Sequence, residues 1–594
     1  MSFWTHAHEP FAVWAPERHR VRLVVDGIGG GAIEMVRDDD GWWSPAPADR
    51  EHLDRVLANP IVDYSYVLGD DPRDYPDPRS RRQYDVHGAS RLYDPAEFPW
   101  TDQSWTGRQL AGSIIYELHL GTFTPEGTLD AAIGKLDHLR SIGVDLVELM
   151  PVNGFDGTHN WGYDGVGWFA VDEQYGGPPA YQRFVDACHA TGLGVVQDVV
   201  YNHLGPSGNY LPLFGPYLKD GTNTWGDLVN LDGDGSVEVR RFVLDNARMW
   251  FEDYHVDALR LDAVHALSDT SLMHLLEELA VQTMALEAHL GRPLTLIAES
   301  DLNDTMLVTP REGGGFGLDA QWSDDFHHAL HVALTGETSG YYADFAPLSS
   351  LAKVFEQGFF HDGTWSSFRD RYHGRQVDTV HMPAWRLVVC AQNHDQVGNR
   401  ARGDRLSDHL DDDQLVCAAL LTLGGPFTPM LFMGEEWAAS TPFQFFTSHT
   451  DPALAQATAQ GRVHEFARMG WDPDEVPDPQ DPDTFARSAL DWSEPDRGRH
   501  AVVLDAYRRL AALRRSLPEL TDPSFASVSA EADEERQVFT LRRGRLLIAV
   551  NFSETAATLK GGAGEILFTT PTPASVRGRH LVLPAHAGVL LRRA

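Results

Sequence analysis

From about Ile114 onward, short apolar runs alternate with amphipathic stretches, and this alternation constrains the fold more than any other feature of the chain. Eight runs have the length and composition of buried strands: IIYELHL, VDLVELMPV, GVVQDVV, DALRLDAV, LTLIAES, LDAQWS, RLVVCAQ and PMLFM. Most are separated by segments with helical periodicity, such as the apolar stripe of Val239, Phe242, Val243 and Trp250. Repeated strand–helix units predict a parallel sheet, and eight of them predict a closed (β/α)₈ (TIM) barrel.

The sequence on either side of these units is different in character. Short strand-like runs such as FAVWA and VRLVV alternate with turn-rich spacers near the start, and short strands return near the end. We therefore predict three domains in an α/β protein. An immunoglobulin-like β-sandwich covers residues 1–107, a barrel with insertions covers 108–525, and a second β-sandwich covers 526–594.

The composition excludes several classes of partner. Acidic residues outnumber basic ones 86 to 48, for a formal charge of −38, which disfavours nucleic acid and anionic membranes. A generally acidic proteome would explain the same charge, so it does no more than exclude. The three cysteines are far apart, and we find neither a signal peptide nor an uninterrupted apolar span. We expect a cytoplasmic protein that binds neither nucleic acid nor membrane.

Ionisable residues follow four of the apolar runs, at the strand ends where barrel enzymes place their chemistry. They are Asp198 and His203 after the third run, Arg260, Asp262 and His265 after the fourth, Glu299 after the fifth, and His394 and Asp395 after the seventh. Taken alone, Arg260 and Asp262 are most simply a structural ion pair, because alternate strand residues share a face. The convergence of carboxylates and histidines from four strands on one mouth instead favours catalysis.

The residue types point to glycoside hydrolysis, which needs one protonated and one ionised carboxyl group. We expect Arg260 to keep Asp262 ionised as a nucleophile. Nearby negative charge is expected to raise the pKa of Glu299 toward that of a general acid. The stretch NWGYDGVGWF is a candidate for an aromatic wall facing the sugar, although Trp161 and Trp168 fit a core role equally well.

Four motifs, in order, resemble those of the alpha-amylase superfamily of glycoside hydrolases: DVVYNH (198–203), LRLDAVH (259–265), IAES (297–300) and QNHDQVGN (392–399). The resemblance implies a retaining mechanism. In that mechanism Asp262 is the nucleophile, Glu299 is the general acid/base, and Asp395 binds hydroxyls of the distorted sugar.

The same resemblance implies a set of substrate-binding residues around these carboxylates. His203 and His394 match residues that contact the sugar at the cleavage point, and Tyr163 matches a tyrosine that stacks on it. Arg260 matches the arginine beside the nucleophile, with Asp198 as its acidic support. His265 completes the predicted set.

Three longer stretches resemble the branch of the superfamily that acts on maltooligosyltrehalose and related α-glucans: HNWGYDGVGWFAVDEQYGGP, YNHLGPSGNYLPLFGPY and DDFHHALHVALTGETSGYYADF. This implies cleavage of the α-1,4 bond next to a terminal trehalose. Glycogen branching and isoamylase-type debranching remain alternatives. The insertion 355–371 is a candidate source of aromatic side chains for the trehalose unit, and a packing insertion is an equally good interpretation.

No cofactor or metal is expected. His327 and His331 have the spacing of two ligands on a helix, but the sequence offers no third ligand for them. Asn202 matches a residue that binds calcium in some amylases, and the sequence leaves its role open.

Overall fold

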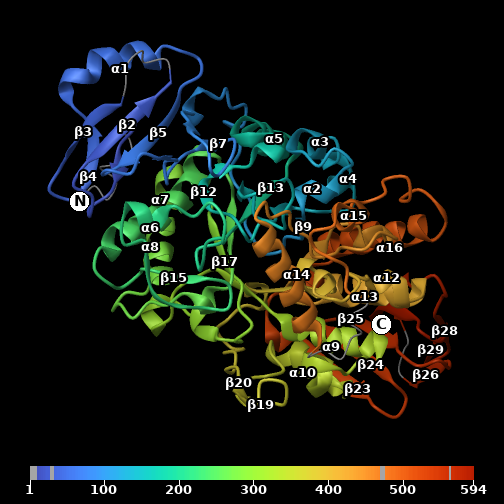
Figure 1. Cartoon of the computed structure of the whole chain (residues 1–594). Coiled ribbons are helices and arrows are strands. Elements are labelled where there is room, and N and C mark those ends of the chain that lie inside the picture. The colour runs from blue at the N-terminus through green and yellow to red at the C-terminus, as the bar shows by residue number, and fades with distance from the viewer. Residues whose placement is uncertain (1–9, 27–31, 468–474, 561–563, 594) are drawn as a thin grey trace.

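A computed structural model describes residues 10–26, 32–467, 475–560 and 564–593 (Figure 1). Within these ranges eight parallel strands close into a barrel, and each of them lies in one of the eight apolar runs. In barrel order they are β9 (Ile115–Leu118), β10 (Leu146–Leu149), β13 (Gly194–Val199), β16 (Ala258–Leu261), β17 (Thr295–Ala298), β18 (Ala320–Trp322), β21 (Leu387–Cys390) and β22 (Thr428–Phe432). The predicted barrel is confirmed.

The interior of the barrel changes from apolar to ionisable along the strands. Ile115, Leu146, Val196 and Ala258 belong to an apolar cluster inside the barrel. Because alternate strand residues share a face, the inward positions two residues further on carry ionisable groups. These groups are Glu117, Glu148, Asp198 and Arg260. Apolar side chains therefore fill one end of the barrel interior, and ionisable side chains lie at the carboxyl ends of the strands.

Helices between the strands cover the barrel from outside. The longer ones include α5 (Gly177–Thr191), α7 (Ser236–Arg248), α8 (Leu275–Leu290), α9 (Asp324–Thr335), α13 (Asp412–Gly424) and α16 (Gly498–Ser516). The stripe predicted from Val239, Phe242 and Val243 is buried on α7, which confirms its assignment to the core. No helix in the described ranges is both long and apolar enough to cross a membrane.

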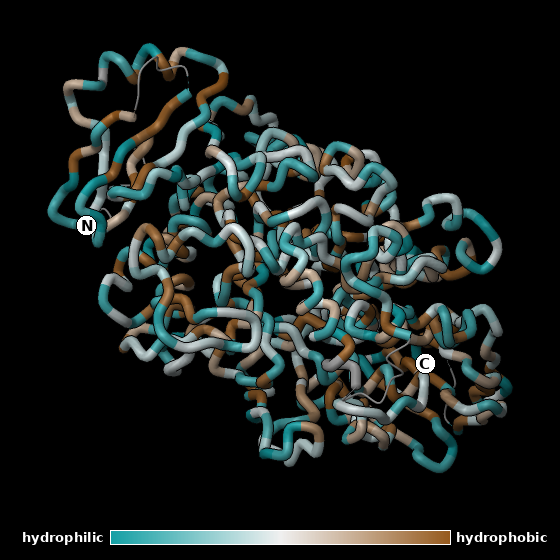
Figure 2. Tube along the Cα trace, in the orientation of Figure 1, coloured by the Kyte–Doolittle hydropathy of each residue, from teal (hydrophilic) through white to brown (hydrophobic). Residues whose placement is uncertain are grey.

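Antiparallel sheets flank the barrel on both sides (Figure 1). Neighbouring strands of the N-terminal sheet are, in order, β1 (Val13–Trp14), β4 (Trp42–Pro45), β3 (Ile33–Arg37), β2 (Val21–Val25), β5 (Asp63–Leu68), β8 (Ser90–Arg91) and β7 (Arg82–Gln83). The C-terminal part, from β23 (Val528–Asp533) to β30 (Gly588–Arg593), forms a five-stranded and a three-stranded sheet. Figure 2 shows hydrophobic stretches along these strands, while the outer loops are mainly hydrophilic. The domain limits at 107/108 and 525/526 stay predictions.

Candidate active site

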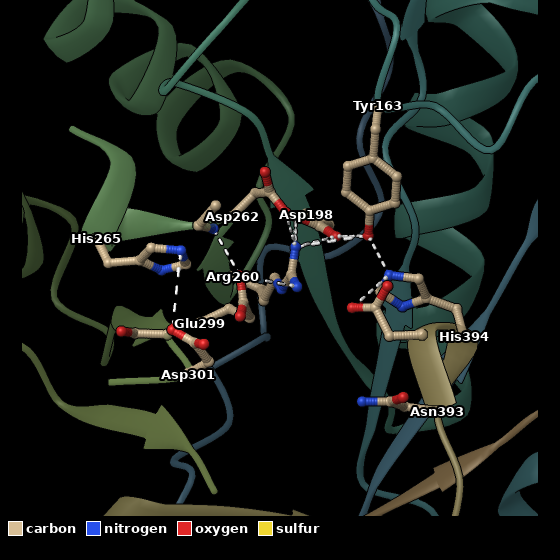
Figure 3. A network of polar contacts seen from close by, with 12 residues as sticks. Tyr163, Asp198, Arg260, Asp262, His265, Glu299, Asp301, Asn393 and His394 are labelled. Atoms are coloured by element: carbon tan, nitrogen blue, oxygen red, sulfur yellow. Dashed lines mark hydrogen bonds and ion pairs between the residues drawn. The ribbon is translucent and has the colours of Figure 1, made fainter. Parts of the chain in front are cut away.

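A buried arginine joins two carboxylates at the ends of β13 and β16 (Figure 3). Arg260 pairs in register with Asp198 on the neighbouring strand, and its Nη1 lies 3.0 and 2.9 Å from the two Asp198 oxygens. The same nitrogen donates to Asp262 Oδ1 over 2.8 Å. The ring of Trp322 lies against the guanidinium, 4.3 Å from its carbon. Burial raises the pKa of Asp198 to about 7, against the opposing effect of Arg260.

Glu299 lies beside Asp262 in a different environment. Its Oε2 accepts a 2.7 Å hydrogen bond from the backbone N–H of Ala263 and is 3.6 Å from Nη2 of Arg260. Burial raises the pKa of Glu299 to about 8, and the negative charges of Asp262 and Asp395 add to the rise. The expected rise is therefore present, with burial rather than neighbouring charge as its main cause. At neutral pH Glu299 keeps its proton.

Asp262 is held from both sides by donors. Asn202 donates from Nδ2 to Asp262 Oδ2 over 2.8 Å, opposite the hydrogen bond from Arg260. His203 lies behind Asn202, with Nδ1 2.6 Å from its Oδ1 and Nε2 2.9 Å from the carbonyl of Tyr163. Both ring nitrogens of His203 thus lie within hydrogen-bonding distance of protein atoms. Its predicted contact with sugar stays a prediction.

On the other side of the mouth, His394 and Asp395 begin the short helix α11 (His394–Gly398) after β21. Nε2 of His394 is 2.9 Å from the hydroxyl of Tyr163 and 3.3 Å from Asp395 Oδ2. Burial lowers the pKa of His394, but Asp395 and Glu117 outweigh it and raise that pKa to about 9. His394 therefore lies between a carboxylate of the mouth and a carboxylate of the barrel interior.

Glu117 is the residue that sequence reasoning missed. Its Oε1 is 2.6 Å from Nδ1 of His394, and its Oε2 accepts a 2.9 Å hydrogen bond from the His394 backbone N–H. The signal was available in IIYELHL, where a carboxylate interrupts an otherwise apolar buried strand. Ionisable groups are rarely buried unless they are paired, so such a residue calls for a partner.

His265 contacts Asp301 rather than the carboxyl groups of Asp262, Glu299 or Asp395. Its Nε2 is 3.9 Å from Asp301 Oδ1. Asp301 also accepts a 2.8 Å hydrogen bond from Arg369, in the turn between β19 (Thr364–Ser366) and β20 (Arg371–His373). The predicted insertion 355–371 is therefore tied to the segment that carries Glu299. In the same turn, Phe368 is 45% exposed.

The three carboxyl groups differ in accessibility. The side chains of Asp262 and Glu299 are 13% and 15% exposed, whereas that of Asp395 is 43% exposed. Each of the three therefore keeps part of its side-chain surface in contact with solvent. Trp161 and Trp168 are buried, so the proposed aromatic wall is wrong for both and the core interpretation holds.

The two histidines of α9 considered as metal ligands, His327 and His331, instead lie within hydrogen-bonding distance of other protein groups. Nδ1 of His327 is 2.8 Å from the carbonyl of Ala391, and His331 is 2.8 Å from Glu337. In the parts of the chain that the structure describes, no group of three or more His, Cys, Asp or Glu side chains is arranged to hold a metal ion. The amide group of Asn202 is engaged by Asp262 and His203, as described above.

A parallel barrel with these carboxyl groups at the carboxyl ends of its strands defines a glycoside hydrolase of the alpha-amylase kind. The family described as alpha amylase, catalytic domain, matches residues 91–212, and a domain of unknown function (DUF3459) matches residues 523–590. A provisionally assigned alpha amylase from Salmonella typhimurium has the same fold, with a TM-score of 0.87 and 36% identity over 98% of this chain and 97% of its own.

Full-length relatives narrow the class. The chain is 57% identical to the malto-oligosyltrehalose trehalohydrolase of Rhizobium sp. (strain M-11), over 98% of this chain and 97% of that one. It is 58% identical to the enzyme of the same name from Arthrobacter ramosus, over 98% and 99% of the two chains. The chain belongs to the malto-oligosyltrehalose trehalohydrolase family.

Proposed function

We propose that the protein hydrolyses the α-1,4-glucosidic bond next to the terminal trehalose of maltooligosyltrehalose and so releases trehalose for trehalose biosynthesis. The relatives that carry this name match the chain along nearly its whole length. The observation that carries the chemistry is the contrast between two neighbouring carboxyl groups. Asp262 accepts hydrogen bonds from Arg260 and Asn202, while burial keeps a proton on Glu299.

In the proposed mechanism Asp262 attacks the anomeric carbon while Glu299 gives its proton to the oxygen of the leaving sugar. The bond between that carbon and the leaving oxygen breaks, and a covalent glycosyl–Asp262 ester forms. Glu299, now ionised, takes a proton from water, and the resulting hydroxide attacks the same carbon and frees Asp262. Two inversions leave the anomeric configuration unchanged. Asp395 and Tyr163 contact the sugar ring during both steps.

The leaving side of the site lies beside Glu299, because that residue protonates the leaving oxygen. The segment that follows it carries Asp301, which binds Arg369 in the turn of the β19–β20 hairpin. Phe368 is next to Arg369 and has nearly half of its side-chain surface exposed. An aromatic ring suits the apolar face of a glucosyl unit. We therefore assign this turn to recognition of the trehalose unit.

Incubation of the pure protein with maltotriosyltrehalose and with maltopentaose tests the proposed function. Selective release of trehalose from the first substrate is expected. Rapid cleavage of internal bonds in both substrates would contradict it. Amylose and glycogen serve as further substrates. A rise in the number of α-1,6 linkages in amylose would indicate a branching transferase. Loss of α-1,6 linkages from glycogen would indicate a debranching hydrolase. The expectations of a cytoplasmic location and of no nucleic acid partner stay predictions.

A further inference from the structure

Glu117 lies in the barrel interior below the mouth, and within the described part of the chain its carboxyl group is hydrogen-bonded to one residue, His394. Its two oxygens are used by one residue, Oε1 by the ring and Oε2 by the backbone of His394. Glu117 is 1% exposed, so it does not itself meet a sugar. Whatever it contributes to the reaction must pass through His394.

Beyond His394, hydrogen bonds continue across the mouth (Figure 3). Nε2 of His394 is 2.9 Å from the hydroxyl of Tyr163, and that hydroxyl is 2.7 Å from Asp198 Oδ2. Asp198 in turn accepts from Arg260, which also donates to Asp262. A continuous chain of polar contacts therefore joins β9, at one side of the barrel, to the nucleophile at the end of β16.

Because a tyrosine hydroxyl has one proton, this chain has two possible directions. In the first, His394 donates from both nitrogens and the Tyr163 hydroxyl donates to an ionised Asp198. In the second, a protonated Asp198 donates to Tyr163, whose hydroxyl donates to a neutral His394. The two arrangements differ in the position of one proton, which rests either on His394 or on Asp198.

The charges around the chain favour the first direction. Arg260 donates to both oxygens of Asp198 and opposes the effect of burial, so the pKa of Asp198 is about 7 and the carboxylate is ionised above that pH. At the other end, the Nε2 proton of His394 faces Asp395 at 3.3 Å. Glu117 supplies the negative charge next to Nδ1. Among the described residues, the titratable and charged groups that face this imidazole or its chain include Glu117, Glu148, His119, Tyr163, Asp198, Arg260, Asp262 and Asp395.

We infer that Glu117 is a positioning residue for the hydrolysis proposed above: as the counter-ion of a protonated His394, it fixes the direction of the hydrogen-bond chain from His394 through Tyr163 to Asp198. The imidazolium then presents an N–H both to Tyr163 and to Asp395, the carboxylate assigned to the sugar hydroxyls. Without the Glu117 charge the proton moves toward Asp198, and Asp395 loses its donor. The inference rests on the proposed function.

Glu148 provides a matched control. It lies directly beside Glu117 on the neighbouring strand, in register, and is equally buried. Neither of its side-chain oxygens has a hydrogen-bond partner among the described residues. Burial, with the charges of Glu117 and Asp198, raises the pKa of Glu148 well above its usual range, which favours its neutral form. Glu148→Gln therefore replaces a neutral group by one of the same shape.

The test compares the pH profiles of kcat/KM for wild type, Glu117→Gln and Glu148→Gln. In Glu117→Gln the imidazolium loses its counter-ion, so the part of the alkaline limb that reports His394, above the part set by Glu299, should move down by about one pH unit. The ratio of kcat/KM at pH 6 to that at pH 9.5 should then rise about eightfold over wild type, because the pKa of His394 starts at about 9. Glu148→Gln should keep the wild-type profile, and Glu117→Asp, which restores the charge, should recover the position of the limb. An unchanged limb in Glu117→Gln, or an equal shift in both glutamine variants, overturns the inference.

A second measurement needs neither substrate nor a folded Glu117 variant. Nitrogen NMR of wild-type protein labelled in its histidine rings reports the protonation of each ring, and His394→Asn identifies the signals of His394. At pH 7.5 both His394 nitrogens should be protonated, and a neutral ring overturns the inference. If wild type releases no trehalose, the proposed substrate fails. The pH profiles then follow any α-glucan that the wild type does hydrolyse, and the NMR result stands.

Discussion

The backbone N–H of Ala263 donates a 2.7 Å hydrogen bond to Oε2 of Glu299, so the residue that follows Asp262 holds the carboxyl group of Glu299 in place. Ala263 has φ 40° and ψ 50°, in the left-handed region that non-glycine residues rarely adopt. Such a conformation costs on the order of 1–3 kcal/mol and persists only where the surroundings enforce it. The turn thereby fixes the spacing of the two groups that the mechanism requires side by side.

Glu299→Gln should remove the proton donor and leave the fold intact. Glutamine keeps an oxygen that accepts from the Ala263 N–H, so the thermal midpoint should hardly change. Turnover of maltotriosyltrehalose should fall by roughly 10²–10⁴-fold, the usual contribution of general acid–base catalysis. Glu312→Gln, at an exposed position, is the control and should behave as wild type. Wild-type activity in Glu299→Gln would remove this residue from its assigned role.

The rate should fall as pH rises through about 8. Burial raises the pKa of Glu299 to about 8, and a general acid is active only below its pKa, so the protonated fraction is lost on the alkaline side. The measurement is kcat/KM between pH 5 and pH 9.5. In Glu299→Gln the residual rate should lack the fall centred near pH 8. A wild-type rate that stays constant to pH 9.5 would be incompatible with the assignment.

Replacement of Asp262, the proposed nucleophile, should abolish turnover without a gross structural change. Asp262→Asn lacks the ionised carboxylate that would attack the anomeric carbon, so we expect turnover to fall by about 10⁴-fold or more. The stereochemistry gives an independent check. Proton NMR of the wild-type reaction should show the new reducing end first as the α-anomer, because a double displacement retains configuration. Initial appearance of the β-anomer would indicate direct attack by water.

Arg260→Met should destabilise the protein as well as inactivate it. The substitution leaves Asp198 buried without its guanidinium partner, and breaking a buried pair in this way costs roughly 3–5 kcal/mol. We expect a clear fall in the thermal midpoint and loss of activity. Arg579→Met, at an exposed position in the C-terminal part, should leave both unchanged. An unaltered midpoint in Arg260→Met would show that the pair contributes little to stability.

Phe368→Ala should affect substrate choice more than catalysis. If the turn of the β19–β20 hairpin binds the trehalose unit, KM for maltotriosyltrehalose should rise several-fold while hydrolysis of maltopentaose changes little. Tyr372→Ala is the control, since Tyr372 is 74% exposed on the same hairpin and packs on Trp365. Equal effects of the two substitutions on both substrates would argue for a general loosening of the hairpin.

The fold could be predicted from the sequence because buried strands are apolar over short, continuous stretches of residues. A strand buried on both faces must be apolar along its length, and the alternation of such runs with amphipathic helices is visible without coordinates. The candidate site was predictable for a related reason. Asp198, Asp262 and Glu299 interrupt or end apolar runs, and residues at the carboxyl ends of barrel strands meet at one mouth.

What the sequence did not reveal depends on contacts between distant segments. Glu117 is 277 residues from His394 along the chain, and no local pattern joins the two. The burial of Trp161 depends in a similar way on the carbonyl of Gln444, which accepts from its indole N–H. The larger role of burial in the pKa of Glu299 also becomes apparent only when the surrounding side chains are in place.

The guanidinium of Arg260 is held along its edge by Asp198 and Asp262 and across its flat face by Trp322. Both carboxylates accept from one nitrogen, Nη1, so what lysine lacks here is the flat face: its compact ammonium cannot lie along the ring of Trp322 as the guanidinium does. Replacement of Arg260 by lysine, a mild change on most protein surfaces, should therefore leave the ring of Trp322 without its planar partner.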